Sequence, residues 1–149
     1  MSRNTLILLA AGGSAALLAG AFVFQFFGYP PCALCLWQRW PHAAAIVIGI
    51  LALTIPLRVW PWLGALAAAT TSGIGIYHTG IERGFWPGPT SCTGSGDLGS
   101  LAGDLLSTAG PRLVMCDQAT MLGPLSMASW NALFSAVLVV LWIMAARRN

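Results

Sequence analysis

Residues 29–42 read "YPPCALCLWQRWPH", and this short segment separates two long apolar runs of the chain. Its two prolines end the preceding run, because proline restricts its own backbone and that of the residue before it. Two cysteines, an arginine and a histidine follow at the edge of the next run. Lipid disfavours ionisable side chains, so their presence here indicates a functional site at a membrane surface.

The composition places the whole chain in the membrane class. Of its 149 residues, 57% are hydrophobic and only 7% are charged. A helix needs about 20 apolar residues to cross a hydrocarbon core of about 30 Å. Four stretches meet this requirement, at about residues 5–27, 36–54, 61–80 and 128–146. We therefore expect an all-α membrane protein, with residues 1–149 forming one integral-membrane domain built as a four transmembrane helix bundle.

Two features of the apolar runs have alternative interpretations. The first run could be a cleaved signal peptide, but the apolar part of such a peptide is usually only about 7–15 residues long, which favours a retained span. Small residues recur at every fourth position in two runs, at Gly12, Ala16 and Gly20 and at Ala65, Ala69 and Gly73. These stripes either let helices approach closely or only reflect how common small residues are in membrane helices.

The placement of arginines predicts the orientation, because short cytoplasmic loops are enriched in basic residues. One side of the bundle would carry arginines without any acidic residue: Arg3, Arg58, Arg147 and Arg148. The other side would carry Arg39, Arg83 and Arg112 together with Glu82, Asp97, Asp104 and Asp117. Both termini are therefore expected in the cytoplasm, with one short periplasmic loop and one long one over residues 81–127. The four cysteines would then face the oxidising side, where disulfides persist.

Two kinds of ligand are disfavoured by the sequence. The seven arginines are scattered along the chain, whereas nucleic-acid binding requires a basic stripe or patch. Four cysteines and two histidines raise the question of zinc, but structural zinc sites usually combine two tight ligand pairs. Only Cys32 and Cys35 form such a pair. We therefore expect no nucleic acid and no metal.

The Cys-x-x-Cys pair has the features of a reactive thiol site. We expect Cys32 and Cys35 at the start of a helix, where unpaired N–H groups and the helix dipole favour thiolate over thiol. Arg39 follows Cys35 by four residues and so shares its helical face. Its cation would stabilise a thiolate at Cys35, or an anion formed beside it. The alternative is an interfacial arginine whose side chain only reaches towards the headgroups.

His78 and Glu82 form a second pair on one helical face, near the outer end of the third run. Together with Arg39 they could bind a quinone head group and support its protonation. For His78, a satisfied interfacial histidine is an equally good interpretation. His42, about one turn beyond Arg39, is expected to have a packing role.

The other two cysteines, Cys92 and Cys116, lie in the long loop, which is rich in Gly, Pro and Ser. A helix-linked pair and a loop pair indicate a relay, in which each thiolate attacks the next disulfide through a mixed disulfide. The electrons must finally leave, and a membrane quinone is the obvious two-electron acceptor. The same loop has leucines at helical spacing: Leu98, Leu101, Leu105 and Leu106. They predict a short amphipathic helix, either on the membrane surface or covering the bundle.

These motifs resemble those of the disulfide bond formation protein B (DsbB) family, bacterial inner-membrane thiol:quinone oxidoreductases. The resemblance covers nearly the whole chain: "CALCLWQR" at 32–39, "YHTGIERGFWPGPTSC" at 77–92 and "CDQATMLGPLSMASWN" at 116–131. It implies an inner-membrane enzyme that reoxidises a DsbA-like periplasmic thioredoxin-fold protein. The electrons would pass to ubiquinone or menaquinone, which supports disulfide formation in secreted proteins.

The resemblance also implies a role for each cysteine. Cys92 would form the mixed disulfide with the DsbA-like partner, and Cys116 would be the disulfide partner of Cys92. Cys116 would then exchange with Cys32. Cys35 would meet the quinone as a thiolate, with Arg39 stabilising the charged species.

Two alternatives to general disulfide formation stay open. One is a non-enzymatic four-helix membrane scaffold whose cysteines form two static disulfides. The other is the same oxidase chemistry directed at one dedicated client. An arginine on the Cys-x-x-Cys face has no use in a static disulfide, and this favours an enzyme over a scaffold.

Overall fold

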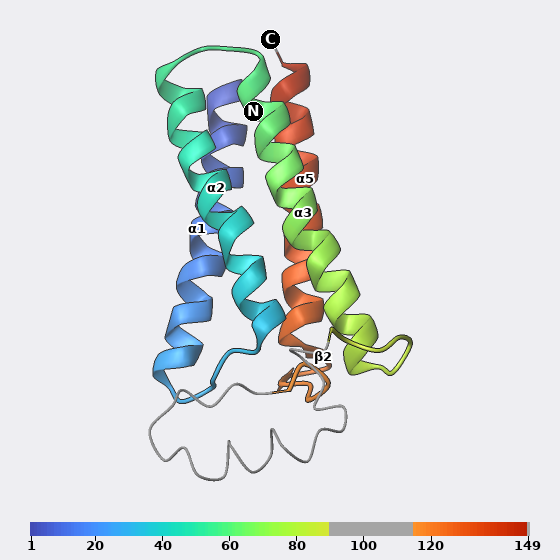
Figure 1. The fold of residues 1–149 in the computed structure, drawn as a ribbon. Helices are drawn as coiled ribbons and strands as arrows, with labels where there is room; N and C mark the ends of the chain where they lie inside the picture. Colours follow the sequence, from blue (N-terminus) through green and yellow to red (C-terminus); the bar gives the residue numbers. More distant parts are fainter. Residues whose placement is uncertain (90–114, 149) are drawn as a thin grey trace.

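The structure is a computed structural model that describes residues 1–89 and 115–148, and four long helices make up most of this part (Figure 1). The helices are α1 (Arg3–Phe26), α2 (Ala33–Thr54), α3 (Val59–Glu82) and α5 (Met127–Arg147). Each contains nearly all of one expected apolar run, so the predicted helical bundle is confirmed. The expected loop helix lies outside the described residues, as do Cys92, Asp97, Asp104 and Arg112.

Three of the described helices are long and apolar enough to cross a membrane. These are α1, α2 and α5, with mean hydropathies of 2.2, 1.2 and 1.9. Helix α3 is as long as α1, at 24 residues, but it does not belong to this group. Its inward face is more polar, because Thr71, Ser72 and His78 are buried there.

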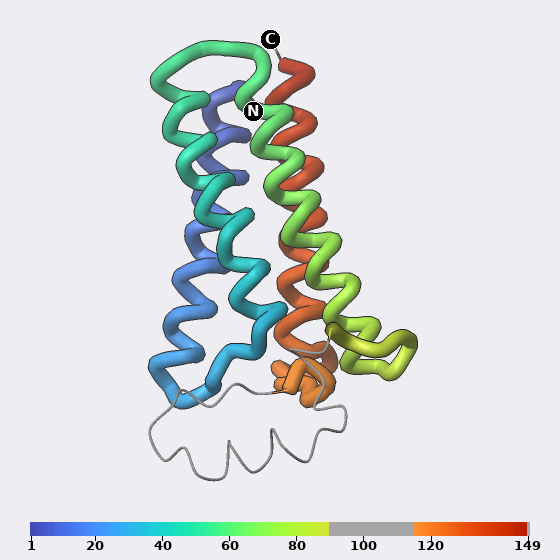
Figure 2. Tube along the Cα trace, viewed as in Figure 1, coloured from blue at the N-terminus to red at the C-terminus, as the bar shows by residue number. Residues whose placement is uncertain are grey.

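The helices pack as a bundle in which each has two main neighbours. Helix α3 packs extensively against α5 and α2, and α1 packs against α2 and α5, whereas α1 and α3 hardly touch. The chain runs up and down, so both termini lie at one end and the α1–α2 link lies at the other (Figure 2). The short segment of residues 55–58 joins α2 to α3, so these two helices form an antiparallel hairpin (Figure 2).

The core of the terminal half is built around one large aromatic side chain. Trp142 on α5 is completely buried and packs in a cluster with Leu6, Ile7, Ala65 and other apolar side chains of all four helices. A Cβ at Gly64 would lie 2.5 Å from the Trp142 ring, so only glycine leaves room for this side chain. The large Trp142 side chain therefore fills the space beside small residues of the neighbouring helices, and this close packing stabilises the terminal half of the bundle.

The glycines of the two small-residue stripes do not form these helix contacts. Among the described residues, nothing lies within 4 Å of a Cβ built at Gly12, Gly20 or Gly73. The close approaches occur elsewhere: at Gly49 against Ala11, at Gly64 against Trp142 and at Gly75 against Ala132. Of the stripe residues, Ala65 packs in the Trp142 cluster, but the stripe glycines do not bring helices together.

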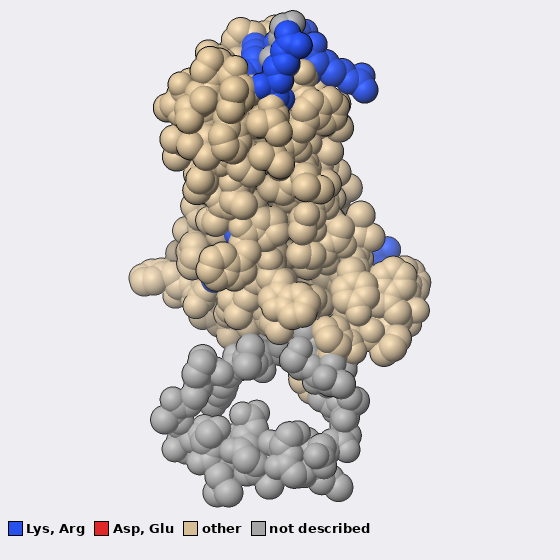
Figure 3. Space-filling model, turned by 45° about the horizontal axis from the view of Figure 1, so that its top comes forward, with Lys and Arg blue, Asp and Glu red and all other residues tan. Residues whose placement is uncertain are grey.

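Arginine side chains gather at the end of the bundle that holds the termini (Figure 3). Arg3 donates hydrogen bonds to the carbonyl oxygens of Ala52 and Leu57, and Arg148 donates to that of Met1. These bonds tie both chain ends to the α2–α3 link. The arginine-rich end therefore lies opposite the end that carries the Cys-x-x-Cys pair.

The cysteine end is shaped by two helix starts. Cys32 caps α2, and its Sγ accepts a hydrogen bond of 3.2 Å from the Cys35 backbone N–H. The predicted helix start at the cysteines is thus confirmed, slightly before the expected residue 36. Ser126 caps α5 in the same way, with a 3.2 Å bond from the Ser129 N–H.

A small hairpin that the sequence did not predict leads into α5. Strand β1 (Met121–Leu122) pairs antiparallel with β2 (Leu125–Ser126). Gly123 in the turn has a φ of +70°, a conformation that favours glycine. The hairpin brings the segment after Cys116 back against the ends of α3 and α5.

Candidate functional site

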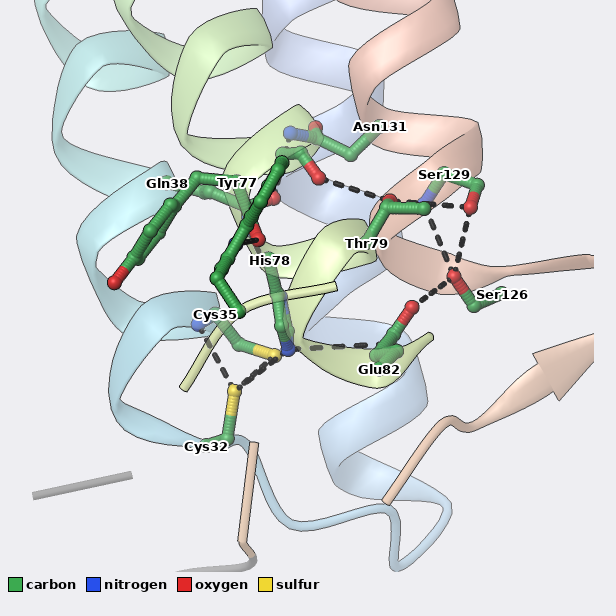
Figure 4. Close-up of polar contacts among 12 residues, drawn as sticks. Cys32, Cys35, Gln38, Tyr77, His78, Thr79, Glu82, Ser126, Ser129 and Asn131 are labelled. Atoms are coloured by element: carbon green, nitrogen blue, oxygen red, sulfur yellow. Dashed lines mark hydrogen bonds and ion pairs between the residues drawn. The ribbon is translucent and has the colours of Figure 1, made fainter. Parts of the chain in front are cut away.

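The two sulfurs of the Cys-x-x-Cys pair lie close together at the start of α2 (Figure 4). Both are free thiols, and the Cys32 thiol donates a hydrogen bond of 2.9 Å to the sulfur of Cys35. This bond and the burial of Cys32 raise the pKa of the Cys32 thiol above its ordinary value. Cys35 is the acceptor and the more exposed of the two, so it is the sulfur better placed to carry a negative charge.

Cys116 packs directly onto this pair. It is completely buried and disulfide-bonded, and it forms an apolar cluster with Cys32, Leu34 and Ile81. Its backbone is also hydrogen-bonded to the ring of His78. Of the four cysteines expected to react, the structure brings together Cys32, Cys35 and Cys116, and Cys92 lies outside the described residues.

His78 lies between the sulfurs and a carboxylate. Its Nε2 is 3.5 Å from the Cys32 Sγ and 3.8 Å from Oε1 of Glu82, four residues further along α3. The expected common face of His78 and Glu82 is therefore present. The imidazole contacts a sulfur directly, which the sequence did not reveal.

Glu82 also connects α3 to the start of α5. Its Oε2 accepts a hydrogen bond from the hydroxyl of Ser126, the residue that caps α5. That hydroxyl is 2.9 Å from the hydroxyl of Ser129, which in turn is 3.1 Å from that of Thr79 on α3 (Figure 4). The carboxylate is thus fixed by three hydroxyl-bearing residues on two helices.

Arg39 reaches from α2 towards α1. Its guanidinium donates a hydrogen bond of 2.8 Å to Oε1 of Gln25 and lies 4.7 Å from the centroid of the Phe22 ring. Its Nε is buried and has no hydrogen-bond partner among the described residues. One donor of Arg39 is therefore free for a further acceptor.

A cavity of about 500 Å³ lies between the helices at this end of the bundle. The four residues expected to bind a quinone all line it: Cys35, Arg39, His78 and Glu82. Apolar side chains complete the wall, among them Leu17, Phe24 and Phe134. The volume and the mostly apolar lining are typical of small-molecule sites, and the unpaired Arg39 Nε suits a ligand with a carbonyl acceptor.

The structure adds a group of polar residues that the sequence analysis did not single out. Gln38, Thr71 and Asn131 form a hydrogen-bonded cluster with His42 beside the cavity. His42 is buried, consistent with the expected packing role, but it bonds to polar partners. Two signals could have identified the group: Cys35, Gln38 and His42 share a helical face, and an amide at Asn131 interrupts an apolar run.

The same sulfurs and imidazole could also hold a metal ion. The ligand atoms of Cys32, Cys35 and His78 all lie within 4.8 Å of one another. Thiolates and imidazole are the donors that zinc prefers, and three protein ligands leave a fourth position open. Within the described residues, this donor set coincides with the candidate redox site.

Comparison with known proteins identifies the family of this chain. No match was found among curated proteins, and none among solved structures. The family model described as "Disulfide bond formation protein DsbB" matches residues 3–145, which contain α1, α2, α3, all but the last two residues of α5, and all four cysteines. The chain therefore belongs to the DsbB family of membrane proteins that act in disulfide bond formation.

Proposed function

We propose that this protein is a thiol:quinone oxidoreductase that reoxidises a DsbA-like thioredoxin-fold protein and reduces ubiquinone or menaquinone. The observation that carries the proposal is the position of the Cys-x-x-Cys pair between two different neighbours. Cys32 packs against Cys116 on one side. Cys35 lines the cavity with Arg39 on the other. A pair in this position can pass electrons from a reduced cysteine pair of the loop to a ligand in the bundle.

The electron path consists of thiol–disulfide exchanges followed by one transfer within the membrane. A thiolate of the partner attacks the Cys92–Cys116 disulfide at Cys92, and the second partner thiolate resolves this mixed disulfide. Cys116, now reduced, attacks Cys32 of an oxidised Cys32–Cys35 pair, and Cys35 leaves as a thiolate. The Cys92 thiolate then attacks Cys116, which re-forms the Cys92–Cys116 disulfide and releases Cys32 as the second thiolate of the reduced pair. The partner dithiol loses two electrons and two protons in the net reaction, and the quinone takes up both.

The residues around the cavity have distinct tasks in this proposal. The quinone supplies a two-electron acceptor. Arg39 would hold a carbonyl oxygen through its unpaired Nε, and its charge would stabilise the Cys35 thiolate. His78 would hold a proton on Nε2 beside the sulfurs, with Glu82 as the facing carboxylate.

The proposed location is the bacterial inner membrane, with the cysteine end of the bundle in the periplasm. The arginine-rich end, which holds Arg3 and Arg148, would then face the cytoplasm, in agreement with the enrichment of basic residues on that side. An oxidising compartment around the cysteine end would keep the loop disulfide intact.

The static scaffold fits the structure less well than the enzyme does. It needs two permanent disulfides, whereas Cys32 and Cys35 are free thiols next to a buried imidazole. An oxidase for one dedicated client would use the same site and the same chemistry.

Replacing Cys35 by serine tests the proposal. With a reduced DsbA-like partner and a soluble ubiquinone analogue, the purified wild type should reduce quinone continuously, and Cys35→Ser should abolish this turnover because Cys32 can no longer form a disulfide with its neighbour in the pair. Ser14→Ala is the control, since Ser14 is buried in α1 but does not line the cavity, and it should keep the wild-type rate. Unchanged turnover in Cys35→Ser would refute the proposed electron path.

A further inference from the structure

A continuous hydrogen-bonded chain connects the Cys-x-x-Cys pair with the interior of the bundle. It starts at Cys32, whose Sγ is 3.5 Å from Nε2 of His78. The other ring nitrogen of His78, Nδ1, is 3.2 Å from Nε2 of Gln38, and Oε1 of Gln38 is 2.7 Å from Nδ2 of Asn131. Oδ1 of Asn131 is 2.9 Å from Nε2 of His42. The chain thus links residues of α2, α3 and α5.

Bulk water does not determine the orientation of these groups. The side chains of Gln38, His42 and His78 are at most 6% exposed, and Thr71 is fully buried. Buried polar groups satisfy one another, so the donors and acceptors along the chain must alternate. Whether each group is a donor or an acceptor therefore determines which nitrogen or oxygen atom of the chain carries a proton.

Asn131 is held in one orientation by three neighbours. Thr71 donates its hydroxyl proton to the backbone carbonyl of Gln38 at 3.2 Å, so its oxygen accepts from Nδ2 of Asn131 at 3.1 Å. Oδ1 of Asn131 is then the acceptor for the N–H of His42. Reversing the Asn131 amide would place its Oδ1 against the Thr71 oxygen, whose proton is directed at the Gln38 carbonyl, so two acceptors would face each other.

The orientation of Asn131 sets that of Gln38 and, through it, that of His78. Because Asn131 donates to Oε1 of Gln38, the Gln38 amide nitrogen must point towards Nδ1 of His78. An amide nitrogen can only donate, so Nδ1 presents its lone pair and the ring proton lies on Nε2. The groups on the Nε2 side agree, because the Cys32 sulfur at 3.5 Å and the Glu82 carboxylate at 3.8 Å are both acceptors. The ring is also hydrogen-bonded to the backbone of Cys116, which packs in one cluster with Cys32.

We propose that Gln38 is a positioning residue that, held by Asn131, fixes His78 as the tautomer with its proton on Nε2, so that the ring donates a hydrogen bond to the sulfur of Cys32. The role of this hydrogen bond from His78 to Cys32 rests on the proposed function. When the Cys92 thiolate attacks Cys116 of a Cys116–Cys32 disulfide, the Cys92–Cys116 bond forms, and Cys32 leaves with both electrons of the broken bond as a thiolate. The N–H of His78 stabilises this buried negative charge, and no proton is transferred in the step.

The ring tautomer can be read directly by ¹⁵N NMR of the reduced protein labelled at histidine. The chain has only two histidines, so only two imidazole rings contribute to the spectrum. In the wild type, Nδ1 of His78 should be unprotonated and Nε2 protonated. Gln38→Glu places an acceptor opposite Nδ1 with almost no change in shape, and it should move a proton onto Nδ1. Gln38→Leu removes the donor and should give a mixture of tautomers.

The consequence at the sulfur is measured by alkylation of Cys32 in a Cys35→Ser background, followed at the Cys32 peptide by mass spectrometry. Gln38→Leu should slow this alkylation at neutral pH by about tenfold, because a hydrogen bond to the thiolate is lost. Ser72→Ala is the matched control. It removes a buried 3.0 Å bond to the Ala132 carbonyl between α3 and α5, two of the three helices that the chain links, but it lies outside the chain, so the tautomer and the rate should not change.

Both experiments use reduced protein without quinone or partner, so their outcome is independent of quinone-dependent turnover. A proton on Nδ1 in the wild type would overturn the proposal, as would an unchanged alkylation rate in Gln38→Leu. If Gln38→Leu does not fold, the wild-type spectrum and the isosteric Gln38→Glu decide. If the tautomer or alkylation result contradicts the role of Gln38, the proposed quinone reaction is not affected. If turnover persists in Cys35→Ser, the quinone reaction is refuted, but the tautomer of His78 is not affected.

Discussion

The same four helices bury very different groups in the two halves of the bundle. In the terminal half, Trp142 fills the space between the helices and packs against small apolar residues such as Ala65 and Ala68. In the cysteine half, the helices bury Gln38, His42 and His78 beside a cavity of about 500 Å³.

This difference indicates that the terminal half mainly stabilises the fold and that the cysteine half mainly serves the reaction. Cavities and buried polar groups lower the stability of a fold, and a reactive site needs both. The close-packed terminal half can offset that loss, since it joins all four helices. We therefore expect substitutions in the terminal half to change mainly the free energy of unfolding, and those in the cysteine half to change mainly the reaction.

The largest expected effect on stability is that of Trp142→Ala. Removing this fully buried ring should lower the free energy of unfolding by about 3–5 kcal/mol, because it leaves a large cavity that Gly64 cannot fill. Denaturant titration in detergent measures the change. Trp62→Ala is the control, since Trp62 is half exposed and should lose little. Equal losses in the two variants would contradict the separation of the halves.

In the cysteine half, Arg39→Ala should weaken quinone binding by about 10–100-fold, the range expected for loss of a hydrogen bond from a charged group. The KM for the quinone measures this loss, and thermal unfolding should change little. Arg58→Ala at the start of α3 is the control, because Arg58 is exposed at the arginine-rich end. If the KM for the quinone stays the same in Arg39→Ala, Arg39 only anchors the helix at the membrane interface.

A smaller effect distinguishes the two sulfurs of the pair. Because the bond to Cys35 and burial raise the pKa of the Cys32 thiol, Cys32 stays protonated at neutral pH and should form a thiolate only as the pH rises well above the ordinary thiol range. Iodoacetamide reacts with thiolates, so at pH 7 it should label Cys35 at least about tenfold faster than Cys32 in the reduced wild type. Peptide mapping measures both rates, and faster labelling of Cys32 would reverse the assignment.

The sequence predicted well those features that depend on neighbours along one helix. The four helices, the α2 start at Cys32 and the shared face of His78 and Glu82 all follow from apolar run lengths, prolines and helical spacing. These are local properties of the chain. Most of the correct predictions therefore came from residue spacing within a single helix.

Features that depend on contacts between helices were missed or misread. The chain from Gln38 to Asn131 joins residues 93 positions apart, and nothing in the local sequence pairs them. The two small-residue stripes, one with Gly12 and one with Gly73, left close helix packing open as one of two interpretations, but the close helix approaches of glycines lie at Gly49, Gly64 and Gly75. The roles of the cysteines, Arg39, His78 and Glu82 stay predictions until they are tested in the reaction.

Single-turnover reduction of quinone by the reduced protein alone tests the central claim most directly. Wild-type protein, reduced and freed from reductant, is mixed with a ubiquinone analogue without any partner, and quinol formation is followed by ultraviolet absorbance. If Cys32 and Cys35 pass their electrons into the cavity, about one quinol should form for each reduced cysteine pair, which is about two per protein with its four cysteines, a Cys32–Cys35 disulfide should appear, and Cys35→Ser should form neither. Quinone that stays oxidised beside a fully reduced and folded Cys-x-x-Cys pair would contradict the account.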